Sequence, residues 1–377
     1  MRVLILATVL LTLIRGPHIA PAQQPAPTGM AEHDEALRRA QVWREPAVPI
    51  EAARLGENPV GDVTFARDEE VICSFKPDFV SGSTPKFECE RPDGTKIKVK
   101  YGRDNAEIYA EVAASRLLTA LGFPADRMYV VKRIRCYGCP SDPFQGLQCL
   151  NEGQSAASCF PKLDYGSYQD FDYAIVERRL EGEKLETRKV RGWEWGELSK
   201  IDPAAGGASR AEVDALRLLA VFLAHWDNKD KNQRLLCVDE ESPDEGELPD
   251  CDHPVAMVQD LGATFGPFKF DVNGWAKSPV WKDAATCTVS MRHLPYGGST
   301  FPDSRISEEG RVFLGSRLAK LSAQQIRDLF EGARATETPR SRSGTKNAAG
   351  PDVDRWVRVF QNKVRAIVER EPCPAAP

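Results

Sequence analysis

Between residues 70 and 180 the chain contains short stretches in which hydrophobic and polar residues alternate. Side chains on a β-strand point alternately to the two faces of a sheet, so this pattern predicts strands. They are expected at 71–75, 86–90, 96–101, 128–131 and 171–176. In the third strand Ile97 and Val99 share one face, and Lys98 and Lys100 share the other. The lysine face would lie in solvent unless another element covers it.

Elsewhere hydrophobic residues recur at the spacing of an α-helix, and helices are expected at 105–122, 209–224, 322–335 and 353–368. The first begins with Asn105 as its cap and ends at Gly122. The second begins with a capping box formed by Ser209 and Glu212. One face of this helix is expected to be buried, and the residues from His225 onward are expected to form a loop at its C-terminus.

The composition is that of an ordinary globular protein. The 377 residues are 42% hydrophobic and 28% charged, which is enough length and apolar content for two lobes with separate cores. The net charge of -5 and the pI near 5.7 provide no basic field for a nucleic acid backbone or an anionic membrane. Neither is therefore expected as a partner.

The N-terminal residues have the order of a secretory signal peptide. Met1-Arg2 precedes an apolar run, 3–14, that is too short to span a bilayer. Ala20-Pro21-Ala22 then matches the small-residue cleavage pattern. We expect residues 1–22 to be removed, which leaves a secreted or periplasmic protein without stable membrane insertion. An uncleaved anchor is the alternative.

Ten cysteines follow this segment. An even number of cysteines in an exported chain indicates disulfides, although spacing alone does not reveal their pairing. Cys73 and Cys89 lie where a disulfide would close the base of a hairpin. The four cysteines within 136–159 form either a disulfide-stapled insert or a zinc knuckle. The interval 237–251, which a cysteine bounds on each side, holds seven acidic and no basic residues and is expected to be a disulfide-closed tip.

The main candidate chemistry lies in the stretch 225–232. Its order His-x-Asp-x-Lys-x-x-Asn, followed by a later Asp-Leu-Gly, supplies a base, a cation and two metal ligands. Asp227 would accept the proton of an acceptor hydroxyl, and Lys229 would reach the γ-phosphate. Asn232 and Asp260 would bind Mg²⁺ or Mn²⁺ through oxygen atoms.

The predicted strands supply candidates for binding ATP. A lysine on the third strand and a glutamate on the next helix are arranged to orient the lysine onto the α- and β-phosphates, and the candidates are Lys98, Lys100 and Glu111. The loop Gly82-Ser83-Thr84 offers backbone N–H groups and hydroxyls to the phosphates; a plain surface hairpin is the alternative. Glu177 begins a segment whose backbone would contact the adenine, or else belongs to an edge strand.

Three stretches resemble one group of enzymes. Lys98-Val99-Lys100-Tyr101-Gly102, Ala110-Glu111-Val112-Ala113-Ala114 and Ala120-Leu121-Gly122-Phe123 resemble the small lobe of the atypical kinases. That group includes the HipA toxin kinases, the phosphatidylinositol kinases and the secretory-pathway Golgi casein kinase, and the last of these is the most similar. The resemblance implies that Glu111 rather than Glu107 partners the lysine, and that Lys100 binds the phosphates, with Lys98 as the alternative.

The same resemblance implies an α+β, two-lobed protein-kinase-like fold that uses ATP and a divalent metal. Residues 62–180, with a cysteine-rich insert at 136–159, would form a small antiparallel-sheet lobe with one helix. Residues 181–377 would form a mainly helical lobe. Residues 23–61, rich in Pro and Ala, are interpreted as a linker with one short amphipathic piece.

Together these features predict an exported atypical kinase that transfers the γ-phosphoryl group of ATP to a hydroxyl acceptor. A protein Ser or Thr is favoured over a glycan or a lipid as the acceptor. The segment 266–303 lacks Ala-Pro-Glu, so acceptor handling need not follow the protein-kinase pattern. The alternatives are a nucleotide-binding pseudokinase, an adenylyl transferase and a non-catalytic, disulfide-stapled binding protein. His225 is interpreted as a structural histidine.

Overall fold

The computed structural model describes residues 29–61, 63–78, 80, 82–186, 190–238, 251–295, 298–338 and 352–375. The expected signal peptide and the acidic residues between Cys237 and Cys251 lie outside these residues. Within the described part, no helix is long and apolar enough to cross a membrane.

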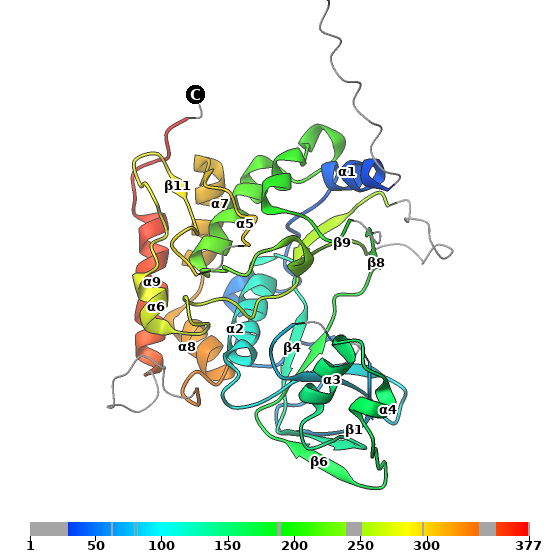
Figure 1. Cartoon of the computed structure of the whole chain (residues 1–377). Coiled ribbons are helices and arrows are strands. Elements are labelled where there is room, and N and C mark those ends of the chain that lie inside the picture. Colours follow the sequence, from blue (N-terminus) through cyan, green and yellow to red (C-terminus); the bar gives the residue numbers. More distant parts are fainter. Residues whose placement is uncertain are drawn as a thin grey trace, which may run out of the picture.

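A seven-stranded sheet occupies one end of the molecule (Figure 1). Its strands, in spatial order, are β4 (Arg127–Val130), β7 (Ile175–Arg178), β3 (Lys96–Lys100), β2 (Lys86–Glu90), β1 (Glu70–Lys76), β5 (Arg133–Tyr137) and β6 (Tyr168–Phe171). All neighbours are antiparallel except β1 and β5, which are parallel. The sheet is therefore mixed, and the prediction of an antiparallel sheet is wrong for this pair. These two strands are not joined by a hairpin, so no local signal sets their relative direction.

The stretch 171–176, predicted as one strand, belongs to two. β6 ends at Phe171, β7 begins at Ile175, and Tyr173 between them has a φ of 50°. A residue in the left-handed region interrupts the extended backbone of a strand. The chain thereby passes from the edge of the sheet into its interior.

Helix α2 (Ala106–Leu121) lies between the sheet and the helical part of the molecule (Figure 1). Asn105 caps its start by accepting a hydrogen bond from Glu107 N at 3.2 Å, and Gly122 ends it with a φ of 89°. Of its 16 residues, 13 are buried, so the helix is covered on nearly all sides and its acidic residues face the protein interior. Together α2 and its neighbours cover the lysine face of β3.

The second half of the chain is mainly helical. Its helices are α5 (Arg210–Phe222), α6 (Val272–Lys277), α7 (Glu308–Ala319), α8 (Ala323–Gly332) and α9 (Val353–Val368), with 3-10 turns η2 (Trp195–Lys200), η3 (Pro203–Ala205) and η4 (Asp230–Asn232). Two small sheets accompany them: β8 (Glu183–Lys184), β9 (Gln233–Cys237) and β10 (Val255–Val258), and then β11 (Thr288–Val289) and β12 (Ser304–Arg305). The capping box of Ser209 and Glu212 is confirmed. Since α5, α8 and α9 share a hydrophobic core with α2, this core fixes α2 relative to the loop that follows α5.

Residues 29–61 also belong to the folded body. They form α1 (Met30–Arg38) and the 3-10 turn η1 (Ile50–Ala52), and Leu37 and Val42 are buried in the shared core. From sequence this segment was interpreted as part of a linker, because it has too few apolar residues for a core of its own. Those few residues are buried against a core that other elements build.

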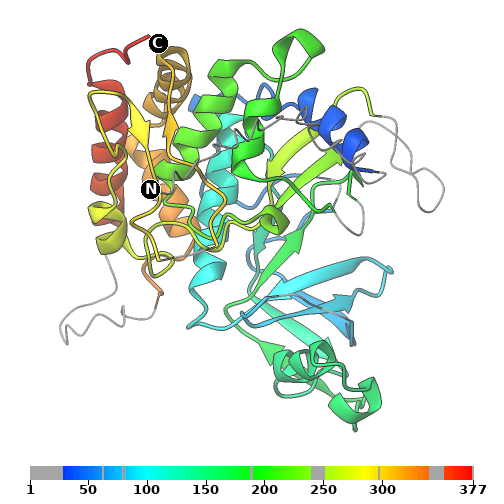
Figure 2. The same cartoon turned by 45° about the horizontal axis from the view of Figure 1, so that its top comes forward.

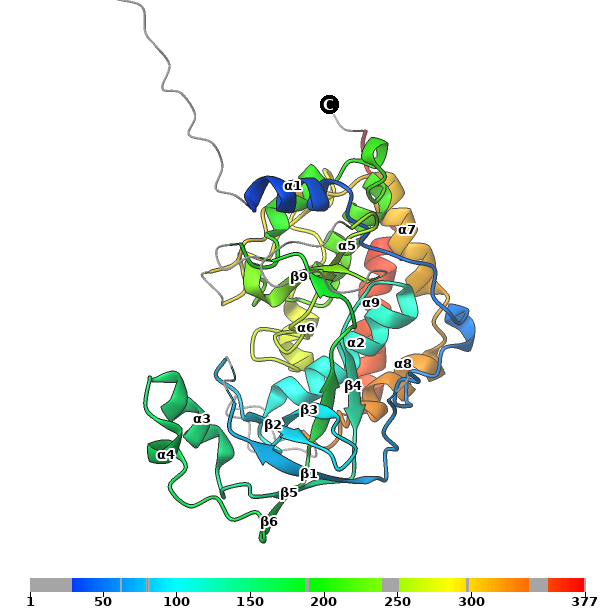
Figure 3. The same cartoon turned by 90° about the vertical axis from the view of Figure 1, so that its right-hand side faces the viewer.

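The ten cysteines form five disulfides: Cys73–Cys89, Cys136–Cys139, Cys149–Cys159, Cys237–Cys251 and Cys287–Cys373. The expected closures of the first hairpin and of the acidic tip are confirmed. The zinc knuckle is wrong, because the four cysteines of the insert bond to one another in pairs. The insert forms α3 (Pro143–Asn151) and α4 (Ala156–Cys159), which lie beside the sheet and away from α5 and α9 (Figures 2 and 3).

Candidate functional site

Lys100 lies at the centre of a buried cluster of charges. Its ammonium is ion-paired with Glu111 on α2 and, at 3.1 Å, with Glu177 on β7. Lys98, two residues earlier on β3, contacts the same Glu177 at 2.9 Å. The side chain of Lys100 is 3% exposed and that of Lys98 is 17% exposed, so Lys100 is the more enclosed of the two. The fold thus brings together the strand lysines and the helix glutamate that were singled out from sequence.

The contacts within this cluster keep Lys100 and Glu177 charged, whereas burial outweighs the charge of Lys100 at Glu111 and raises the pKa of that carboxyl to about 8. Burial raises the pKa of Glu177, but Lys100 and Lys98 outweigh burial and hold that pKa well below its usual range. Burial lowers the pKa of Lys100, but Glu111 and Glu177 outweigh burial and raise it well above its usual range. The ammonium of Lys100 and the carboxylate of Glu177 are therefore both charged at neutral pH, and each holds the other in place.

Side-chain amides hold the loop that follows α5. Asn232 Nδ2 donates to the main-chain oxygen of Asp227 at 2.6 Å, which draws the two ends of the stretch together. Gln233 Nε2 donates to the main-chain oxygen of Asn228 at 3.1 Å. The side chain of Asp227 is 26% exposed, and its carboxylate pairs with Lys229 at 2.8 Å. The predicted base and the predicted cation are therefore direct neighbours.

Main-chain hydrogen bonds join this loop to Asp260. Gln259 N and Asp260 N both donate to the main-chain oxygen of Asn232, at 2.9 and 3.2 Å. The two residues predicted to bind a metal are thus close together. Burial raises the pKa of Asp260, but Lys100 and Lys86 outweigh burial and bring that pKa to about 2. The carboxylate is therefore charged at neutral pH and lies within electrostatic range of the lysine cluster.

Glu107, in the first turn of α2, connects the two sides of the site. It is ion-paired with Lys269 and accepts a hydrogen bond from Thr84 Oγ1 at 2.5 Å. A Cβ at Gly262 would lie 2.8 Å from Glu107 Cγ, so the Asp-Leu-Gly turn needs its glycine for this close approach. From sequence Glu107 was considered only as a partner of the strand lysine. Its contacts come from distant segments and leave no local signal.

Lys86, at the start of β2, is a candidate that the sequence did not single out. It is 5% exposed and lies opposite Lys100 in the register of β2 and β3. A Cβ at Gly82 would lie 2.7 Å from Lys86 Nζ, so the ammonium lies against the Gly82-Ser83-Thr84 loop. Burial lowers the pKa of Lys86, and the charges of Lys100 and Lys98 lower it further. The sequence does not reveal this position, because Lys86 falls on the same face of the sheet as Lys100 only through the register in which β2 pairs with β3.

β7 lies inside the sheet, between β4 and β3, so the interpretation of its segment as an edge strand is wrong. Glu177 is opposite Lys98 on one side and Met128 on the other. A residue in an interior strand uses its main-chain groups within the sheet, so a backbone contact to adenine from this segment must come from residues after Arg178. The structure gives the Glu177 side chain a different contact, as the carboxylate partner of two lysines.

Asn232 and Asp260 can supply two oxygen ligands to a cation. Because Asn232 Nδ2 donates to Asp227, its Oδ1 is the amide atom left for another partner. In the described part of the chain, no group of three or more His, Cys, Asp or Glu side chains is arranged to hold a metal. Mg²⁺ often takes only one or two protein carboxylates and completes its shell with substrate phosphates and water. The pair therefore fits a cation that binds together with a phosphorylated substrate.

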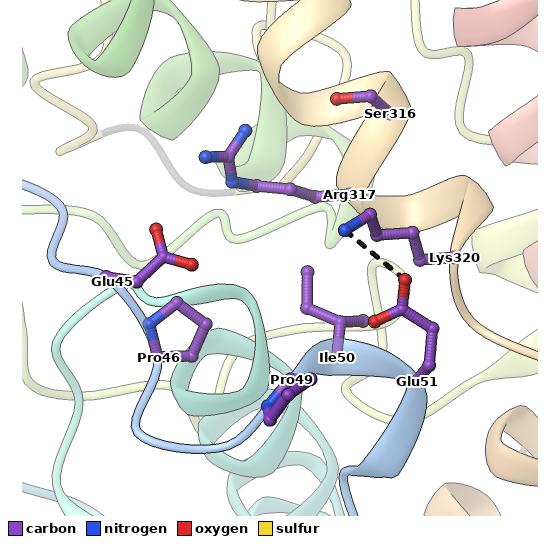
Figure 4. A pocket seen from close by; sticks show the side chains of 8 residues that line it. All are labelled: Glu45, Pro46, Pro49, Ile50, Glu51, Ser316, Arg317 and Lys320. Carbon is purple, nitrogen blue, oxygen red and sulfur yellow. Dashed lines mark ion pairs between the residues drawn. The ribbon is translucent and has the colours of Figure 1, made fainter.

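A pocket of about 270 Å³ lies elsewhere, between residues 45–51 and α7 (Figure 4). Lys320 on its wall pairs with Glu51 at 3.3 Å, and Arg317 lies over the ring of Trp43. The cations of this pocket already have partners, and none of the candidate residues lines it. It is separate from the charged cluster.

His225 makes the stability of the protein depend on pH. Its ring is buried, and burial lowers its pKa from 6.5 to about 4. The folded state disfavours the imidazolium, so stability is lost as the pH falls from about 6.5 to about 4, by about 3 kcal/mol in total. In urea unfolding at about pH 7 and about pH 4.5, His225→Gln is expected to lose less stability between the two pH values than the unchanged protein. Equal losses in both proteins would contradict a buried, neutral His225.

No match is found among models of protein families, curated proteins or solved structures. What characterises the chain is the set of groups that its fold brings together. They are a buried lysine with two carboxylate partners, a second buried lysine beside a glycine loop, and two aspartates and an asparagine on two adjoining loops.

Proposed function

We propose that the chain is an exported atypical kinase with a two-lobed, protein-kinase-like fold. The seven-stranded sheet and α2 form the smaller lobe, and the mainly helical residues 181–377 form the larger one. The enzyme transfers the γ-phosphoryl group of ATP to a hydroxyl acceptor, with Mg²⁺ or Mn²⁺ as the accompanying cation. A protein Ser or Thr is the favoured acceptor.

The observation that carries this proposal is the ion pair between Lys100 on β3 and Glu111 on α2. A lysine on a central strand, clamped by a glutamate of the helix packed on the sheet, is arranged to hold the α- and β-phosphates of ATP. Hydrogen bonds to Asn232 bring Asp260 to the loop that carries Asp227. Segments far apart in the sequence thus bring together a carboxylate, several lysines and oxygen atoms, which are the kinds of group that phosphoryl transfer needs.

In the proposed reaction these side chains act by position and charge. As the acceptor oxygen bonds to the γ-phosphorus, its proton passes to the Asp227 carboxylate, the bond to the oxygen that bridges the β- and γ-phosphorus atoms breaks, and ADP leaves. Lys229, beside Asp227, neutralises charge on the transferred group. A divalent cation held by Asn232 and Asp260 would neutralise charge on the phosphates.

The five disulfides support the exported location. Disulfides persist in the periplasm and outside the cell and are rare in a reducing cytosol. All ten cysteines are paired, and the Cys73–Cys89 disulfide joins the strands that flank the candidate phosphate loop. Reduction is therefore expected to loosen the base of that loop.

The transfer of label from ATP tests the proposal. The purified, oxidised protein is incubated with an extracellular extract, Mn²⁺ or Mg²⁺, and ATP labelled at either the γ- or the α-phosphorus. Transfer of the γ label alone supports a kinase, whereas transfer of the α label indicates an adenylyl transferase. No transfer, but a melting temperature raised by ATP, indicates a pseudokinase. The absence of both effects would contradict any nucleotide-dependent role.

Lys100→Met is expected to weaken the use of ATP more than Lys98→Met. Lys100 is the more enclosed lysine and has two carboxylate partners. The loss of one charge-assisted contact costs about 1.5–3 kcal/mol, which corresponds to a fall of about 10- to 150-fold in kcat/KM. Melting temperatures are measured for both variants, because Lys100→Met also leaves buried carboxylates without their partner. A larger kinetic effect of Lys98→Met would move the phosphate lysine to position 98.

A further inference from the structure

Lys86 is a buried lysine whose ammonium forms no ion pair with any residue that the structure describes. It is 5% exposed, and in the described part of the chain no hydrogen bond or ion pair connects its Nζ to another residue. Two carboxylates act on its charge: Glu107, which is ion-paired with Lys269, and Asp260, which makes no ion pair with Lys86. Burying an ammonium without a partner costs several kcal/mol, so this arrangement requires a compensating contact.

The surroundings of Lys86 indicate what that contact is. Its Nζ lies against Gly82, on the same face of the sheet as Lys100. The charged groups that face it are Lys98 and Lys100 from β3, Glu107 from α2, and Asp260 from the turn after β10. Three ammonium groups therefore lie near one another on this face of the sheet, and among the described residues Lys86 is the one of the three without an ion-pair partner.

A phosphate chain has the chemistry that fits this position. It carries several negative charges, and a lysine ammonium serves as a compact point charge for phosphate oxygens. Asp260, the predicted cation ligand, lies within electrostatic range of Lys86, so a phosphate and its cation would find their partners side by side. Gly82 has a φ of 97°, which favours glycine, and it brings the loop backbone close to the Lys86 ammonium.

We propose that Lys86 binds the phosphate chain of the nucleoside triphosphate, beneath the Gly82-Ser83-Thr84 loop, as a second phosphate lysine beside Lys100. This inference rests on the proposed use of ATP. In this proposal Lys86 contacts the phosphate chain and not the nucleoside. Its contribution is therefore confined to ligands with a phosphate chain.

The test compares Lys86→Met with Lys96→Met, which removes an exposed lysine from the same sheet. Calorimetric titrations of the full protein with ATP, AMP, adenosine and tripolyphosphate, each with Mg²⁺, give the Kd values. Lys86→Met is expected to weaken the binding of ATP by at least about tenfold and to leave adenosine binding unchanged. Lys96→Met is expected to match the unchanged protein with every ligand.

A melting curve without ligand separates this role from a structural one. Methionine has a similar length and no charge, so Lys86→Met is expected to melt at the same or a higher temperature than the unchanged protein. A lower melting temperature, or equal weakening of ATP and adenosine binding, would show that Lys86 supports the fold and would overturn the proposal. Unchanged ATP binding in Lys86→Met would overturn it too.

Failure of the proposed kinase function gives a different result. If the unchanged protein binds tripolyphosphate but not ATP, and Lys86→Met loses that binding, the kinase function fails while Lys86 stands as a phosphate ligand. If the unchanged protein binds neither compound, both proposals are overturned.

Discussion

Asp227→Asn is expected to lower the rate of phosphoryl transfer by about 10²- to 10⁴-fold, the contribution of a positioned general base. Asparagine has nearly the same shape as aspartate but does not accept the proton of the acceptor hydroxyl. The hydrogen bond from Asn232 uses the main-chain oxygen of residue 227, so the substitution preserves it. The ion pair with Lys229 is partly exposed, and the loss of such a pair costs about 1 kcal/mol or less. The fold and the binding of ATP should therefore remain intact.

The measurement is the single-turnover rate at saturating ATP, together with the Kd for ATP. Asp230→Asn is the matched control, because Asp230 is exposed in the same loop and its Oδ1 accepts a hydrogen bond that an asparagine Oδ1 can also accept. This control should keep its rate within a factor of about two. A normal rate in Asp227→Asn would refute the assignment of the base. A similar fall in both variants would point to a disturbed loop.

Asp260→Asn is expected to lower transfer by about 10³-fold, because the loss of a cation ligand removes several kcal/mol of charge stabilisation. The carboxylate has a pKa of about 2 and is fully charged at neutral pH. The neutral amide is a weaker ligand for Mg²⁺ or Mn²⁺. The substitution also removes a negative charge near Lys100 and Lys86. The affinity of the site for a phosphate chain without a bound cation should therefore rise.

These two effects have opposite signs and can be separated. The Mn²⁺ concentration for half-maximal activity should rise at least about tenfold in Asp260→Asn, whereas the affinity for ATP in the presence of a chelator should stay equal or increase. Asp252→Asn, with an 83% exposed side chain, is the control. Full activity of Asp260→Asn would refute the metal assignment. Weaker binding of ATP under chelation would show that Asp260 acts on the nucleotide by another route.

Local patterns were sufficient for much of the fold. Helix α2 begins after Asn105 and ends before Gly122, as predicted, and the capping box before α5 lies where it was expected. The Cys73–Cys89 closure also follows from a hairpin whose two strands are adjacent in sequence. Each of these features depends on residues close together along the chain, where side-chain type and backbone preference act directly. The sequence also predicted the site residues Lys100, Glu111 and those of the later loop, because the strand, the helix and the loop that carry them each have a local pattern.

The sequence by itself therefore determined α2, α5, α8 and α9, the hairpin of β1 and β2, and the residue types available for chemistry. Only the tertiary structure decided that β1 pairs with β5 in parallel, that Glu177 binds two lysines, and that Lys86 is buried beside Lys100. These features depend on the register between strands and on contacts between segments far apart in the chain. Because burial is a property of the assembled core, Lys100, which alternation alone places on a solvent face, becomes a buried charge once α2 packs on that face of the sheet.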